Sequence, residues 1–196
     1  MKCADCKQEQ KNRCDKEGFD CTGGKQDLTP YKEDFNQGCH VISGHLQAEF
    51  GNKLTRFEEL VNFASRMQYK KLGMAFCVGL ADEASILAKM LGNKGFNVDS
   101  VCCKVCGLDK KDYEVPYAKK DKKFEALCNP IGQAMILNKG NTELNISVGL
   151  CVGHDILFQK YSEAPVTTFV AKDRVLAHNP LGVVYSSYYR KKFIGS

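Results

Sequence analysis

Segments typical of a β-strand and segments typical of a helix alternate four times between residue 70 and the end of the chain. The strand-like segments are apolar runs or alternate apolar with polar residues, whereas the helical ones repeat apolar residues at i, i+3 and i+4. We expect strands over 72–78, 96–105, 144–150 and 165–171. This alternation is typical of an α/β fold. We therefore predict a mainly parallel sheet of about four or five strands with helices on both faces, a Rossmann-like three-layer arrangement.

Local signals mark where several helices begin. Thr55 and Glu58 have the spacing of a capping box, in which each residue's side chain bonds the other's backbone N–H. Asn129 is followed by proline, a combination typical of an N-cap with proline in the first turn, and Asn179 is followed by proline in the same way. We predict helices beginning at all three places. The Lys-rich segment 109–125 is predicted to be a solvated loop.

The amino-terminal segment differs in composition from the rest. Residues 1–29 contain cysteines, glycines and charged residues but almost no large aliphatic side chains. Such a segment buries too little apolar area to offset its chain entropy, so it needs a cross-link to become ordered. We predict a Cys-rich metal-binding arm over 1–29 and an α/β domain over 30–196.

Composition and motifs restrict the location and the partners. The net charge of +5 arises from interspersed basic and acidic residues, and no nucleic-acid-binding motif is found. No apolar run approaches the roughly 20 residues of a membrane span, and no signal peptide is recognisable, so we expect a cytoplasmic protein without a membrane partner. Gly-x-Gly-x-x-Gly, Walker-type and Gly-x-Ser-x-Gly motifs are absent, which leaves nucleotide binding and serine hydrolysis without support.

The chain has 11 cysteines, more than a domain of this size needs for stapling. Reduced thiols, metal ligands and redox thiols are the remaining interpretations. One group lies in the amino-terminal arm, where two thiolates from a Cys-x2-Cys turn and two later cysteines can surround zinc or hold an iron–sulfur cluster. The alternative is a tail whose thiols are incidental. The predicted ligands of the arm are Cys3, Cys6, Cys14 and Cys21.

A second group of cysteines is predicted to meet only after folding. In a parallel α/β sheet the carboxyl ends of the strands lie at one edge, where ligands bind. Since adjacent side chains of a strand point to opposite faces, only one of Cys102 and Cys103 is expected to face this crevice. The alternative is that each cysteine is an ordinary small buried residue. Cysteines lie at or near predicted strand ends and just before the predicted helix that begins at Asn129; they are Cys77, Cys102, Cys103, Cys128 and Cys151.

Two residues could assist these thiols. A helix amino terminus at Asn129 favours the thiolate form of Cys128. His154 follows Cys151 by three residues and can act as a ligand or a proton donor, while the neighbouring Asp155 could instead cap the following helix.

Other polar residues allow two interpretations each. Cys103-x2-Cys106 can be a redox dithiol, although the motif alone is weak. The segment 172–174 (Lys-Asp-Arg) can contact an anionic ligand or form a solvated loop. Cys39, His40 and His45 lie on a predicted helix at spacings that favour a structural role.

The order and length of several motifs resemble an uncharacterised prokaryotic family catalogued as domain of unknown function 1847. The resemblance covers nearly the whole chain. The motifs that carry it are 75–80 (AFCVGL), 100–105 (SVCCKV), 128–130 (CNP), 149–155 (GLCVGHD), 164–168 (APVTT), 172–174 (KDR) and 178–180 (HNP).

The resemblance implies metal binding without an established substrate or reaction. It implies that the four cysteines of the arm are ligands, and that an inner set is formed by Cys77, Cys128, Cys151 and His154 with one of Cys102 or Cys103. The leading interpretation is a metal-binding protein whose thiol-rich crevice holds zinc or an iron–sulfur cluster, with redox or sulfur chemistry possible there. The alternatives are a metal-free thiol oxidoreductase using a low-pKa cysteine, and a non-catalytic metal sensor or carrier.

Overall fold

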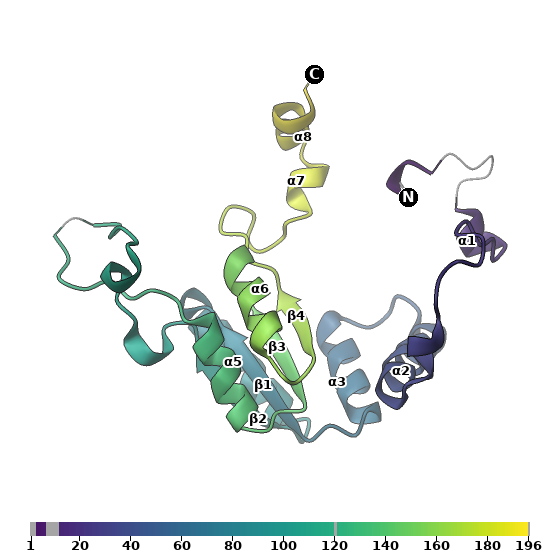
Figure 1. The fold of residues 1–196 in the computed structure, drawn as a ribbon, viewed down its shortest axis with the longest axis horizontal. Helices are drawn as coiled ribbons and strands as arrows, with labels where there is room; N and C mark the ends of the chain where they lie inside the picture. Colours follow the sequence, from purple (N-terminus) through teal and green to yellow (C-terminus); the bar gives the residue numbers. More distant parts are fainter. Residues whose placement is uncertain (1–2, 7–11, 120, 196) are drawn as a thin grey trace. The chain divides into compact units, whose positions relative to one another are not determined.

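A computed structural model describes residues 3–6, 12–119 and 121–195 of the chain (Figure 1). The chain divides into two compact units, Met1–Gly44 and His45–Ser196. The helical elements that begin in the first unit are η1 (Cys3–Asp5), α1 (Arg13–Lys16), η2 (Thr29–Lys32) and α2 (Asp34–Phe50).

The second unit is built on a four-stranded parallel sheet with strand order β2-β1-β3-β4. The α/β prediction is therefore confirmed. The register pairs Phe76 at the end of β1 with Cys102 of β2 and with Val148 of β3, so these three strands end level with one another. The segments that follow them consequently leave the sheet at one edge. The strands are β1 (Lys71–Phe76), β2 (Asn97–Cys102), β3 (Leu144–Val148) and β4 (Val166–Val170).

Helices cover both faces of this sheet (Figure 1). Leu72 and Met74 of β1 belong to a core cluster shared with α3 (Arg56–Arg66) and α4 (Ala81–Gly92). Ala75 belongs to a second cluster shared with α5 (Pro130–Lys139) and α6 (Val152–Tyr161). The alternation of side chains along β1 explains why neighbouring residues join different clusters. Because both faces are covered, β3 is buried along its whole length and β1 at its four central residues.

Two of the predicted helix starts are confirmed and one is wrong. Thr55 caps α3 in a complete capping box with Glu58, and the Asn129 side chain accepts a hydrogen bond from the Gly132 N–H at the start of α5. No helix begins at Asn179. The carbonyl of Asn179 instead closes a turn with Gly182, and two short helices follow, α7 (Gly182–Tyr185) and α8 (Ser187–Ile194).

The second strand ends earlier than its sequence suggests. After Cys102 the chain forms two short 3-10 helices, η4 (Val105–Gly107) and η5 (Lys110–Tyr113). Within η4, Cys106 has a left-handed φ of 68°. An antiparallel bridge between Asp109 and Ala126 and an ion pair between Lys110 and Glu125 close the base of this loop. We call residues 104–127 the excursion; it leaves the sheet after β2 and returns just before α5 (Figure 1).

The remaining one-turn helix, η3 (Val78–Leu80), connects β1 to α4. A search of the described residues finds no helix with the length and apolar character that crossing a membrane requires.

Candidate functional site

Three cysteines from separate segments meet at the carboxyl edge of the sheet. Cys77 follows β1, Cys103 follows β2, and Cys128 directly precedes the N-cap of α5. The sulfurs of Cys103 and Cys128 are 3.8 Å apart, and the thiols of Cys77 and Cys103 also interact. Cys77 and Cys103 are buried, whereas Cys128 is partly exposed. We call these three residues the thiol cluster.

Backbone hydrogen bonds fix the segments that carry these thiols. The N–H of Cys77 donates to the Val148 carbonyl at 3.0 Å, and the N–H of Cys103 donates to the Phe76 carbonyl at 2.8 Å. The N–H of Asn129 in turn donates to the Cys103 carbonyl at 2.8 Å, which fastens the residue after Cys128 to the end of β2. The cluster is thus attached to the rigid end of the sheet.

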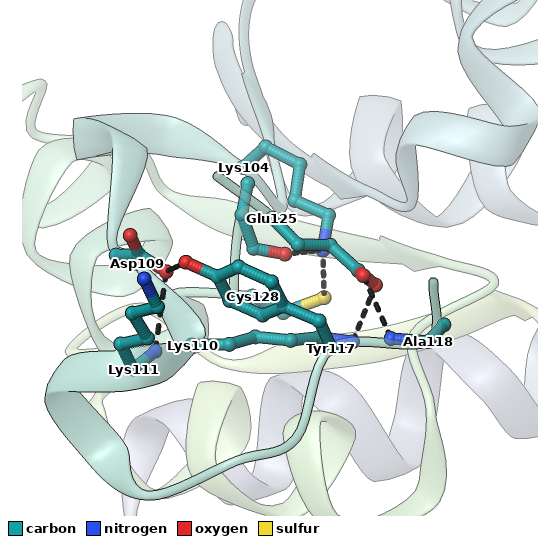
Figure 2. Close-up of polar contacts among 9 residues, drawn as sticks. Lys104, Asp109, Lys110, Lys111, Tyr117, Ala118, Glu125 and Cys128 are labelled. Carbon is teal, nitrogen blue, oxygen red and sulfur yellow. Dashed lines mark hydrogen bonds and ion pairs between the residues drawn. The ribbon is translucent and has the colours of Figure 1, made fainter. Parts of the chain in front are cut away.

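Two of the three sulfurs each accept a hydrogen bond from a different lysine. Lys172, which follows β4, donates to the Cys77 sulfur at 2.9 Å. Lys104 donates to the Cys128 sulfur at 3.3 Å and to the Ala126 carbonyl at 2.7 Å, as Figure 2 shows for the sulfur contact. Charge-assisted hydrogen bonds of this kind stabilise thiolates.

The pKa values of Cys103 and Cys128 are shifted in opposite directions. The two sulfurs share a hydrogen bond, and Lys104 donates to the Cys128 sulfur. The hydrogen bond from Cys103 outweighs the effect of burial and, with the charge of Lys104, lowers the pKa of Cys128 to about 5. The same hydrogen bond, together with burial, raises the pKa of Cys103 far above its usual range. Both shifts favour a thiolate at Cys128 and a thiol at Cys103.

Cys77 is the second cysteine of the cluster whose pKa is lowered. Burial opposes its ionisation, but the hydrogen bond from Lys172 and the backbone N–H of Gly79, together with the charge of Lys172, lower the pKa of the Cys77 thiol. The N–H of Val78 donates to the third sulfur, that of Cys103, at 3.3 Å. The turn after β1 thus supports two sulfurs at once.

Cys151 and His154 lie beside this cluster. Cys151 occupies the N-cap position of α6, and Arg174 donates to its sulfur at 3.5 Å. That hydrogen bond, followed by the charges of Cys151, Cys77 and Cys128, raises the pKa of Arg174. A positive charge on His154 lowers the pKa of Cys128. The structure therefore places both residues within electrostatic reach of the cluster.

Asp155 does not cap α6. The helix begins at Val152, so Asp155 lies inside its first turn, where its carboxylate accepts a hydrogen bond from the Ser147 hydroxyl at 2.6 Å. Cys102 is the last residue of β2 and packs against the second core cluster. Of the two adjacent cysteines, it is Cys103 whose sulfur contacts Cys128.

The other candidate thiols are distributed over the first unit and the excursion. Cys3, Cys14 and Cys21 are exposed and Cys6 is partly exposed, while Cys106 is exposed in η4. Within residues 3–6, 12–119 and 121–195, no three His, Cys, Asp or Glu side chains have a geometry that would hold a metal ion.

Sequence reasoning missed Lys104. Its position next to Cys103 was the only available signal, because the contact with Cys128 depends on the path of the excursion. The cations Lys172 and Arg174 were considered as contacts for an anionic ligand. In the structure their partners are the sulfurs of Cys77 and Cys151.

The fold and the site define an α/β protein with a cation-paired thiol cluster at the carboxyl edge of a parallel sheet. The family described as "Protein of unknown function (DUF1847)" matches residues 20–169, and the chain belongs to this family. The chain is also 52% identical to an uncharacterized protein of Methanocaldococcus jannaschii, MJ0455, over 99% of its own length and 98% of that protein's. No solved structure matches it. The resemblance noted from the motifs is therefore confirmed.

Proposed function

We propose that the thiol cluster is a metal centre. The observation that carries this proposal is the 3.8 Å separation of the Cys103 and Cys128 sulfurs. Two thiolates bound to one tetrahedral zinc ion, with zinc–sulfur bonds of about 2.3 Å, lie about 3.8 Å apart. A disulfide would instead bring the sulfurs to about 2.0 Å. The two side chains thus already have the spacing of ligands on a single ion.

The donor set fits zinc. Cys77 interacts with Cys103 and supplies the third thiolate. Cys151 and His154 are the candidates for the fourth position. Thiolate and imidazole donors suit zinc, and sulfur-only sets also suit iron. In a four-iron cluster each cysteine binds a different iron atom, so the close pair favours one shared ion.

The neighbouring cations would hold the ligands in place. Lys104 and Lys172 donate to ligand sulfurs, which neutralises part of the charge that several thiolates bring together. A bound zinc ion would supply Lewis acidity if one coordination position stays open, and a purely structural or carrier role if all four are filled. Rapid exchange of the ion would favour a carrier or sensor over a structural site.

A second function is favoured by the partly exposed Cys128 and its contact with Lys104. In a thiol oxidoreductase the Cys128 thiolate attacks a substrate disulfide and releases one substrate thiol. The Cys103 thiolate, formed by loss of its proton, then attacks the Cys128 sulfur and releases the second thiol. The product is a Cys103–Cys128 disulfide, which a low-molecular-weight thiol would reduce again.

Anaerobic purification followed by elemental analysis separates the two functions. A metal centre predicts stoichiometric zinc or iron that Cys103→Ser and Cys128→Ser both lose, while the control Cys39→Ser in α2 keeps it. An iron-type visible spectrum would select a cluster over zinc. Metal-free protein in which one cysteine reacts rapidly with iodoacetamide would reject the metal centre and support the oxidoreductase.

We further propose that Cys3, Cys6, Cys14 and Cys21 bind a second ion that orders the amino-terminal arm. The composition of this segment supports the proposal, since it has few apolar side chains to bury. A Cys3→Ser/Cys6→Ser double variant should lose one ion per chain and keep the one at the thiol cluster. An unchanged metal content in that variant would contradict the proposal.

The cytoplasmic location, where thiols stay reduced, also remains a prediction.

A further inference from the structure

We propose that Gln133 of α5 is a positioning residue that sets the spacing of the metal-binding thiols by holding together the ends of β1 and β2. This inference rests on the proposed metal centre and names a residue outside its ligand set. The hydrogen bonds of Gln133 among the described residues go to backbone carbonyls and not to sulfur, so it acts through the backbone that carries Cys77 and Cys103.

The contacts of Gln133 lead directly to the cysteine-bearing segments. Its side-chain Nε2 donates to the Val101 carbonyl at 2.7 Å and to the Phe76 carbonyl at 3.3 Å. Phe76 directly precedes Cys77, and Val101 lies two residues before Cys103. One amide group therefore bridges the ends of the two strands that precede two of the three thiols.

The same carbonyl is used twice. Phe76 accepts from Gln133 and also from the N–H of Cys103 at 2.8 Å. Asn129, the N-cap of α5, lies four residues before Gln133 and donates its N–H to the Cys103 carbonyl. This bond fixes the residue that follows Cys128. The beginning of α5 thus connects the backbone segments that carry all three cysteines. Among the described residues, Gln133 is the only side chain of α5 that hydrogen-bonds to both β1 and β2.

The burial of Gln133 argues against a role in simple core filling. The residue is fully buried at 0% exposure, and its Oε1 has no hydrogen-bond partner in the described part of the chain. A buried amide oxygen without a partner is unfavourable, so methionine of similar volume would fill this space at a lower cost. The amide is useful here because only its N–H groups can bridge the two carbonyls.

Asn145 on β3 provides a matched control. It is also fully buried, and its Nδ2 likewise has no hydrogen-bond partner among the residues that the structure describes. Its Oδ1 accepts from the Thr142 hydroxyl at 2.8 Å, near the amino end of β3 and away from the strand ends that carry the thiols. Replacing either amide by an apolar side chain of similar size therefore makes the same chemical change at opposite ends of the sheet.

The test compares zinc affinity in Gln133→Met, Asn145→Leu and the otherwise unchanged protein by competition with a chelator. All three full-length proteins carry Cys3→Ser/Cys6→Ser, so that the thiol cluster is the site that is measured. Gln133→Met should bind zinc about 10- to 100-fold more weakly, the usual effect of losing a residue that orients metal ligands. Asn145→Leu should keep the original affinity whatever its change in thermal stability. Cobalt-substituted Gln133→Met should show shifted d–d absorption bands, because the ligand geometry changes.

The outcomes separate the two proposals. If the unchanged protein binds neither zinc nor cobalt, the metal centre itself is rejected. If it binds zinc and Gln133→Met binds with equal affinity and an unchanged cobalt spectrum, the role of Gln133 is rejected. Should Gln133→Met fail to fold, Gln133→Asn carries the same test, since its shorter amide keeps a buried donor that does not reach both carbonyls.

Discussion

Removing the ammonium group of Lys104 should raise the pKa of Cys128. Lys104→Met keeps an unbranched side chain, one atom shorter and without charge, and abolishes the donation to the Cys128 sulfur at 3.3 Å. A hydrogen bond to a charged group contributes about 1.5–3 kcal/mol. Both side chains are partly exposed, so solvent screening favours the lower end of this range. At about 1.4 kcal/mol per pKa unit, the expected shift is roughly one unit upward.

The shift can be followed by the pH dependence of alkylation. Metal is first removed with a chelator, iodoacetamide is added at a series of pH values, and modification of the Cys128 peptide is quantified by mass spectrometry. In the unchanged protein the alkylation rate should fall only as pH drops toward about 5, because the pKa of Cys128 is lowered to about 5. In Lys104→Met the same fall should occur about one pH unit higher.

A matched variant controls for the loss of charge. Lys111 lies in the same excursion, but its ammonium group faces the Tyr117 ring at 5.3 Å. Lys111→Met should therefore leave the alkylation profile of Cys128 unchanged. Equal profiles for Lys104→Met and the unchanged protein, or an unchanged protein that titrates near the usual thiol value of about 8.5, would refute the electrostatic account.

Three further predictions concern other contacts. Lys172→Met should raise the pKa of Cys77, whose sulfur Lys172 contacts at 2.9 Å, and alkylation of Cys77 should then require a higher pH. The depressed thiol pKa values should also make the metal-free protein lose stability as pH falls from about 9 toward about 5, which urea titrations at several pH values can measure. Gly149→Ala should destabilise the fold by about 2 kcal/mol or more, because Gly149 has φ +65° and a Cβ there would lie 2.2 Å from Leu80. A Cβ at Gly153 in α6 has no such contact, so the control Gly153→Ala should not lower the thermal stability that unfolding curves measure.

The sequence predicts the sheet well because the strand signals are strong and local. The apolar runs before Cys77 and Cys151 are short, are bounded by glycine, and are separated by helical patterns. The parallel arrangement then follows from chain connectivity. The same reasoning places the cysteines after β1 and β2 at one edge, and the structure brings Cys77, Cys103 and Cys128 together there.

The partners of the thiols are not predictable in the same way. Lys104 reaches Cys128 only because the excursion returns to the sheet beside β2, and no local pattern specifies that path. The expected helix start at Asn179 is wrong for a different reason. The Asp173 carboxylate accepts the backbone N–H groups of Val175 and Leu176 in a local turn, a second turn joins Asn179 to Gly182, and the helix begins only at Gly182.

The burial of Gln133 is also not predictable from the sequence. Within its helix it is one polar residue among apolar neighbours, which by pattern alone indicates an exposed position. Its burial depends on the two carbonyls at the ends of β1 and β2, which become available as partners only after the strands pair.

Zinc-edge X-ray absorption on the Cys3→Ser/Cys6→Ser variant tests the central claim most directly, since that variant is designed to leave only the thiol cluster as a binding site. The account predicts bound zinc with at least three sulfur neighbours at about 2.3 Å. Zinc surrounded only by nitrogen and oxygen neighbours, or no retained metal, would contradict it.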